Sequence, residues 1–188
     1  MKIKVNYNKI LLILLVYVVF INFFKGYINY YPSIPVYPNN ETDLKIMKRE
    51  MTKRTSEDVK FFFDTNESIA TAFIPYVNEP VNELAKIAES QNYIINFFKY
   101  SINRRRPYQI DETFKPLSTK TSGTPSYPAG HAYQAMIIAK HLSNKYPEKK
   151  ELFYTLALKC DQCRVKAGIH YKSDGEFSRK LFYLFNKI

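Results

Sequence analysis

From residue 41 to the C-terminus, apolar residues recur every three or four positions, and prolines, glycines and capping residues interrupt this pattern at intervals. Such spacing is typical of amphipathic helices, and no pair of alternating apolar segments predicts a β-hairpin. Hydrophobic residues make up 46% of the 188 residues, which is enough for one domain with its own core. We therefore predict an all-α fold, with a single helical-bundle domain over residues 42–188.

Local signals predict where the helices of this domain begin and end. Thr55 and Asp58 have the spacing of a capping box, in which each side chain bonds the backbone N–H of the other residue. Gly168 is expected to end a helix, and residues 108–129, which are rich in proline and polar residues, to form a loop. The first expected helix carries the apolar stripe Leu44, Met47 and Met51, and the second starts at Thr55. Three more are expected from Asn66 to Pro75, from Pro80 to Pro107 and over 130–145. The last two are expected over 148–166 and onward from Ser173 or Asp174.

An apolar run at residues 10–24 lies ahead of the domain and follows three lysines. Its length falls between that of a signal-peptide core and a full membrane span of about 20 residues. Bulky residues follow it instead of a small-residue cleavage site, and tyrosines up to Tyr31 suit the headgroup region. We expect an N-terminal transmembrane or signal-anchor segment at 10–31, with a cleaved signal peptide and a buried helix as the alternatives.

The residues on either side of this segment predict its orientation and its connection to the domain. Lysines in the basic tail at 1–9 favour a cytoplasmic N-terminus, which would place the domain on the non-cytoplasmic side of a single-pass membrane protein. Pro32, Pro35 and Pro38 follow at intervals of three, which favours an extended, polyproline-like linker over residues 32–41.

The chain is strongly basic, with 28 Lys and Arg against 17 Asp and Glu and a formal net charge of +11. A solvated basic surface explains such a balance. An anionic substrate, an anionic membrane surface and nucleic acid are the more specific explanations, and charge alone does not choose among them.

Cys160 and Cys163 are the only cysteines, so they cannot supply the four ligands of a structural cysteine–zinc site. Residues three apart on a helix have their Cβ atoms roughly 5–6 Å apart, which is wider than the roughly 3.8 Å of a disulfide. We therefore expect two half-buried thiols rather than a bridge.

The first of three short blocks that concentrate charge contains Lys99, Arg106 and Pro107. Seven residues are close to two helical turns, so Lys99 and Arg106 can face the same side and bind an anion. The planar Arg fork matches phosphate oxygens, and Lys supplies a mobile point charge. A basic helix end that complements its own dipole would explain the same pair.

The second block runs from Tyr127 to His131 with the sequence YPAGH. Pro128 and Gly130 predict a tight turn that enters a helix, and free backbone N–H groups at a helix start attract anions. His131 would lie at the mouth of that turn. A capping or core histidine is the alternative interpretation.

The third block contains Arg164, His170 and Asp174. His170 and Asp174 are four residues apart, so one helical turn brings imidazole and carboxylate together. The carboxylate can hold the Nδ1 proton and leave Nε2 as a nucleophile, while Arg164 can bind oxyanions. An ordinary ion pair between residues i and i+4 is the alternative.

In this order the blocks resemble the signature of the type 2 phosphatidic acid phosphatase (PAP2) superfamily, which includes the class A bacterial acid phosphatases and the vanadium haloperoxidases. The family pattern is K-x6-RP, then PSGH, then SR-x5-H-x3-D. The resemblance covers residues 55–188 and implies a helical domain of the PAP2 or acid phosphatase type. The matching residues are Lys99, Arg106, Pro107, Pro128, Gly130, His131, Arg164, His170 and Asp174.

The resemblance implies a metal-independent phosphatase that hydrolyses phosphomonoesters through a phosphohistidine intermediate. His170 would attack phosphorus, Asp174 would orient and stabilise its imidazole, and His131 would protonate the leaving oxygen and then activate water. No cofactor is implied, although vanadate would bind as a phosphate mimic. The residues implied to hold the phosphate oxygens are Lys99, Arg106, Gly130 and Arg164.

Two positions depart from the family pattern. Ala129 stands where the family has serine, which removes one hydroxyl donor and, by analogy with an oxyanion donor, costs about 10²–10³-fold in rate. Ser126, three residues away, or a water is a candidate replacement. Cys163 replaces the serine before Arg164.

The partners expected for such an enzyme are a phosphorylated small molecule or a lipid phosphate, and the membrane through the N-terminal helix, with no nucleic acid. One alternative is a vanadate-dependent, haloperoxidase-like enzyme. Another is a basic, non-enzymatic, membrane-tethered module in which Arg104, Arg105 and Arg106 help to bind nucleic acid or anionic lipid.

Overall fold

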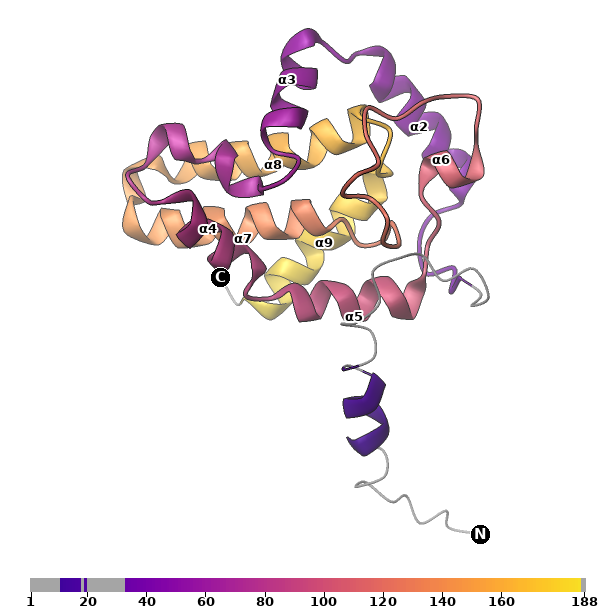
Figure 1. The fold of residues 1–188 in the computed structure, drawn as a ribbon, viewed down its shortest axis with the longest axis horizontal. Helices are drawn as coiled ribbons and strands as arrows, with labels where there is room; N and C mark the ends of the chain where they lie inside the picture. The colour runs from indigo at the N-terminus through magenta and orange to yellow at the C-terminus, as the bar shows by residue number, and fades with distance from the viewer. Residues whose placement is uncertain (1–10, 18, 20–32, 187–188) are drawn as a thin grey trace.

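The computed structural model describes residues 11–17, 19 and 33–186, and every regular element in these ranges is helical (Figure 1). The predicted all-α class is confirmed. The elements from residue 33 onward are α2 (Asn40–Thr52), α3 (Ser56–Asp64), the 3₁₀ helices η1 (Ile69–Ala72) and η2 (Ile74–Tyr76), α4 (Val81–Glu89), α5 (Asn92–Ile102), α6 (Pro107–Ile110), α7 (Gly130–Lys145), the 3₁₀ helix η3 (Pro147–Lys149), α8 (Lys150–Lys166) and α9 (Lys172–Phe185).

Helix α7 lies at the centre of the bundle and packs against α4, α8 and α9 (Figure 1). It is buried around most of its circumference, and its alanines, among them Ala135 and Ala139, let neighbouring helices approach closely. Phe153 of α8 and Phe182 of α9 are fully buried in the same core. Burying one such side chain stabilises the fold by about 1.5–3 kcal/mol. This packing fixes the N-terminal turn of α7 relative to α8 and α9.

The predicted helix from Pro80 to Pro107 is wrong, because the structure has two helices there. Helix α4 ends at Glu89 and α5 begins at Asn92. Between them, the Gln91 side chain accepts a hydrogen bond from Tyr133 Oη (2.6 Å) and donates one to Asn186 Oδ1 (3.0 Å). Helix α5 ends at Ile102 because Asn103 takes a left-handed conformation with φ of 54°, which asparagine tolerates better than most residues.

The predicted helix from Asn66 to Pro75 is also wrong. Two short 3₁₀ helices, η1 and η2, occupy this stretch, and Pro75 lies inside the second. Asn66 is buried, and its side-chain oxygen accepts a hydrogen bond from Thr121 (2.9 Å). The Asn66 side chain therefore makes a tertiary hydrogen bond instead of the helix cap that the local sequence predicts. The capping box of Thr55 and Asp58 at the start of α3 is confirmed.

Gly168 ends α8, as predicted, through a two-bond motif. Its φ is 77°, and its N–H bonds the carbonyl of Val165 (3.0 Å) while the N–H of Ile169 bonds the carbonyl of Arg164 (3.2 Å). These are the two bonds of a Schellman motif, which turns the chain sharply after a helix. The turn brings His170, two residues later, back towards the end of α8.

The residues that connect to α2 lie against the domain. Ile34 N–H donates to the carbonyl of Ile102 (2.9 Å), and the guanidinium carbon of Arg104 lies 4.3 Å from the centroid of the Tyr37 ring. Helix α2 itself starts at Asn40, capped by the Asn39 side chain. Residues 33–39, predicted as part of an extended linker, therefore form contacts that belong to the fold.

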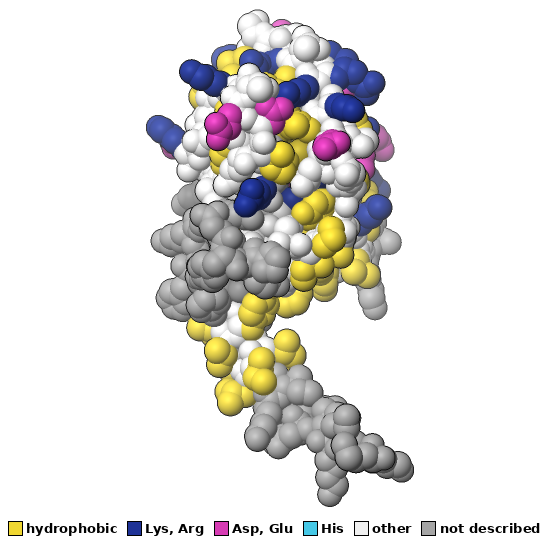
Figure 2. Space-filling model, turned by 90° about the vertical axis from the view of Figure 1, so that its right-hand side faces the viewer, with side chains coloured by type: hydrophobic (Ala, Val, Ile, Leu, Met, Phe, Trp, Pro, Cys, Tyr) yellow, Lys and Arg dark blue, Asp and Glu magenta, His cyan; other side chains and the backbone are white. Residues whose placement is uncertain are grey.

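Residues 11–17 and 19 are helical and project below α5 (Figures 1 and 2). Their apolar side chains are exposed, from 48% for Leu14 to 67% for Leu11. Tyr17 is the exception, because its hydroxyl bonds Ser101 Oγ of α5 (2.9 Å).

Within the described residues, the predicted transmembrane segment at 10–31 does not form a membrane-spanning helix. Across residues 11–17, 19 and 33–186, no helix is both long enough and apolar enough to cross a bilayer. The remainder of that segment and the basic tail at 1–9 lie outside the described residues.

Both cysteines are free thiols, as predicted, and both are fully buried rather than half-buried. Cys163 Sγ accepts a hydrogen bond from Arg164 Nη1 (2.8 Å). Burial raises the pKa of the Cys160 thiol to about 12, so this side chain stays a neutral thiol at neutral pH.

The turn at Gly168 yields the first testable prediction. A Cβ atom there would lie 3.0 Å from Phe114 and 3.3 Å from Met51, on a backbone with positive φ. We expect Gly168→Ala to lower the free energy of unfolding in urea by at least about 1–2 kcal/mol. Gly168→Asn adds the same Cβ but tolerates positive φ better, so it should lose less. An alanine variant as stable as the wild type would contradict the role of this turn.

Candidate functional site

The fold brings the three sequence blocks to one buried place between α5, α7, α8 and α9 (Figure 1). Most of the side chains concerned are at most 4% exposed. Each comes from the end of an element: Lys99 from the last turn of α5, Arg106 from the start of α6, Gly130 and His131 from the first turn of α7, Arg164 from the last turn of α8, and His170 and Asp174 from the turn before α9 and its first turn.

His170 lies between Asp174 and Arg106. Its Nδ1 is 2.9 Å from Asp174 Oδ2, and its Nε2 is 2.9 Å from Arg106 Nη1. A guanidinium can only donate, so Nε2 must accept and the ring proton must sit on Nδ1. This assigns a neutral imidazole whose Nε2 lone pair points towards the arginine. It is the tautomer that a nucleophilic histidine requires.

Asp174 is fully buried and accepts hydrogen bonds from four donors. Oδ2 accepts from His170 Nδ1, from the backbone N–H of Tyr171 (3.0 Å) and from Ser126 Oγ (2.5 Å). Oδ1 accepts from Arg104 Nη1 (2.8 Å). Burial raises the pKa of this carboxyl, and the Arg104 charge opposes that rise. Its lone pairs are occupied, so its orientation relative to His170 is fixed.

Arg104 is a central residue that the sequence analysis did not place in the site. It is fully buried, and besides Asp174 it donates to Asp43 Oδ2 of α2 (2.9 Å). Its guanidinium carbon lies 3.8 Å from the centroid of the Tyr171 ring. The only sequence signal was a run of three arginines, and a run does not show which member is buried.

Ser126 does not supply the donor that is missing at position 129. Its hydroxyl is committed to Asp174, and its backbone N–H bonds the carbonyl of Arg104 (2.8 Å). Ala129 is 1% exposed, and its own N–H bonds the carbonyl of Asp174 (3.2 Å). The proposal that Ser126 replaces a phosphate-binding serine is therefore not supported by the geometry.

Lys99 and Arg164 each donate hydrogen bonds to a distant segment of the chain. Lys99 Nζ donates to the carbonyl of Pro125 (2.5 Å). Arg164 Nη1 donates to Thr65 Oγ1 (2.7 Å) and Nη2 to the Thr65 carbonyl (2.5 Å), while its Nε is buried without a partner. Thr65, at the end of α3, is a second residue that the sequence analysis missed. The free Nε leaves one charged donor for a ligand.

His131 is half-buried, and none of the described residues hydrogen-bonds its ring. It lines a cavity of about 170 Å³ that opens beside η1 and α4. The N–H groups of Gly130, His131 and Ala132 form the first turn of α7 and have no intrahelical acceptor. The Lys99 side chain lies close by, since its Cε is 3.8 Å from where a Cβ on Gly130 would stand.

Positive charge is in excess in this interior. The buried cations are Lys99, Arg104, Arg106 and Arg164, and the carboxylates buried with them are Asp43 and Asp174; a third buried carboxylate, Asp161, pairs with Arg179. Two formal positive charges are left without a counterion, which is costly in a place that water does not reach. A tetrahedral dianion would balance them.

Burial and this excess of positive charge together lower the pKa values of the basic groups. Burial lowers the pKa of Lys99 well below its usual value, and the charge of Arg106 lowers it further. Burial lowers the pKa of Arg106 to about 10. The pKa of each imidazole also lies well below its usual value, mainly through burial, with Arg164 as the next cause for His131 and Arg106 for His170.

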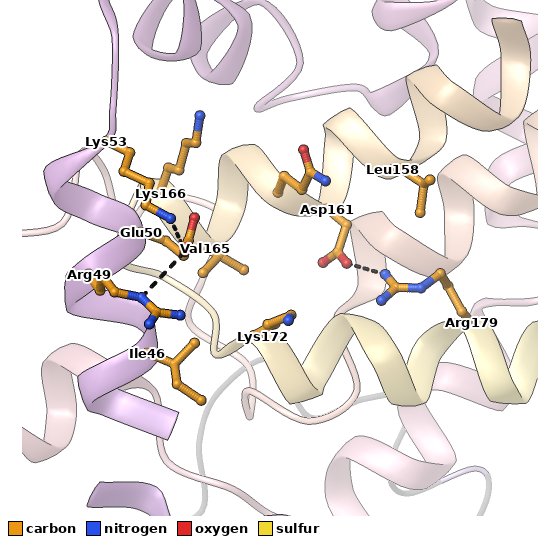
Figure 3. Close-up of a pocket in the computed structure, with 11 residues that line it drawn as sticks. Ile46, Arg49, Glu50, Lys53, Leu158, Asp161, Val165, Lys166, Lys172 and Arg179 are labelled. Carbon is orange, nitrogen blue, oxygen red and sulfur yellow. Dashed lines mark hydrogen bonds and ion pairs between the residues drawn. The ribbon is translucent and has the colours of Figure 1, made fainter. Parts of the chain in front are cut away.

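A larger cavity lies elsewhere. It measures about 380 Å³, lies between α2, α8 and α9, and contains none of the motif residues (Figure 3). Five basic side chains line it, and each has an acidic partner: Arg49 and Lys53 pair with Glu50, Lys166 with Asp58, Lys172 with Glu176 and Arg179 with Asp161. We place the functional site by its convergent titratable groups and not by cavity size.

This arrangement can hold a tetrahedral anion between three cations, with a neutral imidazole available to attack and a second imidazole at the open side. In the described part of the chain, no three His, Cys, Asp or Glu side chains are close enough to hold a metal ion.

Comparison with known proteins agrees with this geometry. No curated protein sequence matches the chain. A family model for the PAP2 superfamily matches residues 84–184, which is more than half of the chain and includes all three blocks. The chain therefore belongs to the PAP2 superfamily.

Proposed function

We propose that this protein is a phosphatase that hydrolyses phosphomonoesters through a covalent phosphohistidine at His170, without a metal ion. Membership of the PAP2 superfamily supports phosphatase-type activity in general. The observation that carries the specific proposal is the neutral His170 ring, whose Nε2 faces a buried region with two unbalanced positive charges.

In the first step, the phosphate group of the substrate binds between Lys99, Arg106 and Arg164 and draws the Arg106 N–H away from Nε2. His170 Nε2 attacks phosphorus, so an N–P bond forms while the bond between phosphorus and the ester oxygen breaks. Asp174 keeps the Nδ1 proton in place and stabilises the positive ring. Fixed charges and backbone N–H groups of α7 stabilise the equatorial oxygens.

His131 acts as the general acid and then as the general base. It donates one to the leaving oxygen in the first step, and it takes one from the attacking water in the second. Water then attacks phosphorus, the N–P bond breaks and inorganic phosphate leaves. Burial is the main cause of the low pKa of His131 in the free protein, and the surrounding positive charges lower the pKa further. A bound phosphate dianion offsets those charges and so favours the protonated ring that the first step needs.

Vanadate is proposed to bind at the same place as a phosphate mimic. A haloperoxidase-like enzyme would oxidise halides once vanadate is added, and no feature of the described site favours that reaction. A basic binding module would bind nucleic acid with a steep salt dependence and show no turnover. On the face in Figure 2, Lys and Arg side chains are interspersed with Asp and Glu and do not form one patch.

Attachment to a membrane by the N-terminal segment, with the domain on the non-cytoplasmic side, is part of the proposal. It rests on the sequence of residues 10–31 and on the exposed apolar side chains of Leu11, Leu12 and Ile13. Many members of the superfamily are membrane-associated.

The purified protein should hydrolyse p-nitrophenyl phosphate and keep its activity in EDTA. His170→Ala should abolish turnover, because no other group replaces the nucleophile. His131→Ala should slow phenyl phosphate more than p-nitrophenyl phosphate, since a stable leaving oxygen needs less protonation. His141→Ala is the matched control, because His141 is the third histidine and is exposed on α7.

Three outcomes of these assays would contradict the proposed mechanism. They are activity that zinc or magnesium restores after chelation, turnover by folded His170→Ala protein, and equal losses on the two esters in His131→Ala.

Anion binding should take up protons. Lys99 and His131 have lowered pKa values in the free protein, so each side chain releases its proton at a lower pH than the isolated side chain does. A bound dianion raises both pKa values, and binding must therefore strengthen as the pH falls. Sulfate is a suitable probe because it remains a dianion throughout. Calorimetry in buffers of different ionisation enthalpy should show net proton uptake on binding, and this uptake should be smaller in His131→Gln. Net proton release would contradict the proposed excess of positive charge in the free site.

Arg104→Met should unfold the site. The substitution leaves Asp43 and Asp174 buried without their shared counterion, and breaking a buried pair in this way costs about 3–5 kcal/mol. Urea unfolding measures the loss, and phosphatase activity of the folded fraction should fall with it. Arg49→Met, at an exposed position on α2, should change stability by less than about 0.5 kcal/mol. Equal effects of the two variants would show that Arg104 has no special role.

A further inference from the structure

The position of His131 determines where the alcohol part of the substrate must lie. A general acid has to come within hydrogen-bond distance of the oxygen that it protonates. His131 lines the cavity of about 170 Å³ beside η1 and α4. If the proposed function holds, the alcohol part occupies this cavity, and its lining selects the substrate.

The lining of this cavity is polar and acidic. Amide and hydroxyl groups come from Asn66, Thr121 and Gln134, and carboxylates from Glu67 and Glu89. No lysine or arginine lines it. Both glutamates are exposed, and neither forms an ion pair with any described residue. This cavity therefore attracts positive charge, on a chain whose formal net charge is +11.

A second cavity of about 370 Å³ adjoins the first, since Asn66, Glu67 and Ser68 line both. Asp64 lines it but pairs with Lys60 (2.5 Å), and Lys120 is its one lining cation. Phe63, which is 52% exposed, also lines it. An exposed aromatic ring beside a carboxylate is a combination that binds amino and quaternary ammonium groups.

The two ends of the site thus have opposite charge. The inner end carries the buried cations that suit a phosphate, and the outer end carries Glu67 and Glu89. A substrate with the phosphate at one end and a cation at the other matches both. A second phosphate or a carboxylate on the alcohol would meet the glutamates and be repelled.

We propose that the substrate is a small phosphomonoester whose alcohol carries a positive charge, such as an aminoalkyl or ammonioalkyl phosphate. This inference rests on the proposed function and narrows it from phosphomonoesters in general. The inner cavity is too small and too polar for two acyl chains, so a diacyl lipid phosphate is the disfavoured class.

The test compares three esters that differ in the charge at the far end: 2-aminoethyl phosphate, propyl phosphate and 2-carboxyethyl phosphate. We expect kcat/KM to decrease in that order, by roughly tenfold between the amine and the acid, as two exposed carboxylates at short range would produce. Dioctanoyl phosphatidate should be a poorer substrate than 2-aminoethyl phosphate.

Substitution of the glutamates assigns the preference to this cavity. In the double variant Glu67→Gln and Glu89→Gln, the ratio of kcat/KM for amine and acid should fall to near one. Glu83→Gln is the matched control, because Glu83 is an exposed carboxylate on the same helix as Glu89 and lines neither cavity. The control should keep the ratio of the wild type.

Phosphonates separate this inference from the proposed function. 2-Aminoethylphosphonate and propylphosphonate lack a cleavable ester bond, so their binding is measured by thermal stabilisation whether or not the protein turns over any ester. Failure to hydrolyse p-nitrophenyl phosphate would overturn the proposed function alone. Tighter binding of the amine, lost in the double glutamine variant, would support the inference. Equal binding, a reversed order of the esters, faster hydrolysis of the phosphatidate, or an unchanged ratio in the double variant would overturn it.

Discussion

The buried carboxylate of Asp174 is the point on which the arrangement of the site depends. Four donors from three parts of the chain converge on it: the His170 ring and the adjacent Tyr171 N–H, the Ser126 hydroxyl and the Arg104 guanidinium. Arg104 in turn holds Asp43 of α2, so the same network ties the first helix of the domain to the last. Losing any donor would leave a charge buried without full compensation, which costs far more than an exposed pair of the same length. The geometry of His170 is therefore fixed both by its neighbours Tyr171 and Asp174 and by the long-range contacts that Ser126 and Arg104 make with Asp174.

The same interior carries more positive charge than it can balance. Folding buries Lys99, Arg106 and Arg164 beside one another, and the lowered pKa values of Lys99 and both imidazoles reflect that cost. A protein selected for stability alone would have no reason to keep such a set. A tetrahedral dianion restores the balance, and a phosphoryl group in transfer spreads negative charge over the oxygens that these cations face. The unbalanced positive charge therefore destabilises the site when no anion is bound, and in the proposed mechanism the same charge stabilises the transition state.

Sequence reasoning predicted the chemistry better than the shape. Spacing alone predicted the contact between His170 and Asp174 and the helix end at Gly168, because both depend on local geometry, although His170 precedes α9 and does not share a helical turn with Asp174. It failed where a distant partner decides the outcome. Gln91 bonds Tyr133 and Asn186, at the break in the predicted long helix, and Asn66 bonds Thr121 instead of capping a helix. Arg104 and Thr65 were missed for the same reason, since their roles exist only through contacts with segments some 60 to 100 residues away. Ser126 was considered as a phosphate donor, and the fold commits it to Asp174.

The proposed mechanism requires His170 to be the nucleophile, and trapping the covalent intermediate tests this requirement most directly. The protein would be mixed with p-nitrophenyl phosphate, quenched within the first turnovers under alkaline denaturing conditions that preserve phosphohistidine, and digested for mass spectrometry. The account predicts one phosphoryl group, on the peptide that contains His170 and attached to that ring. Turnover with the phosphoryl group on another residue, or with no phosphorylated protein at any quench time, would contradict it.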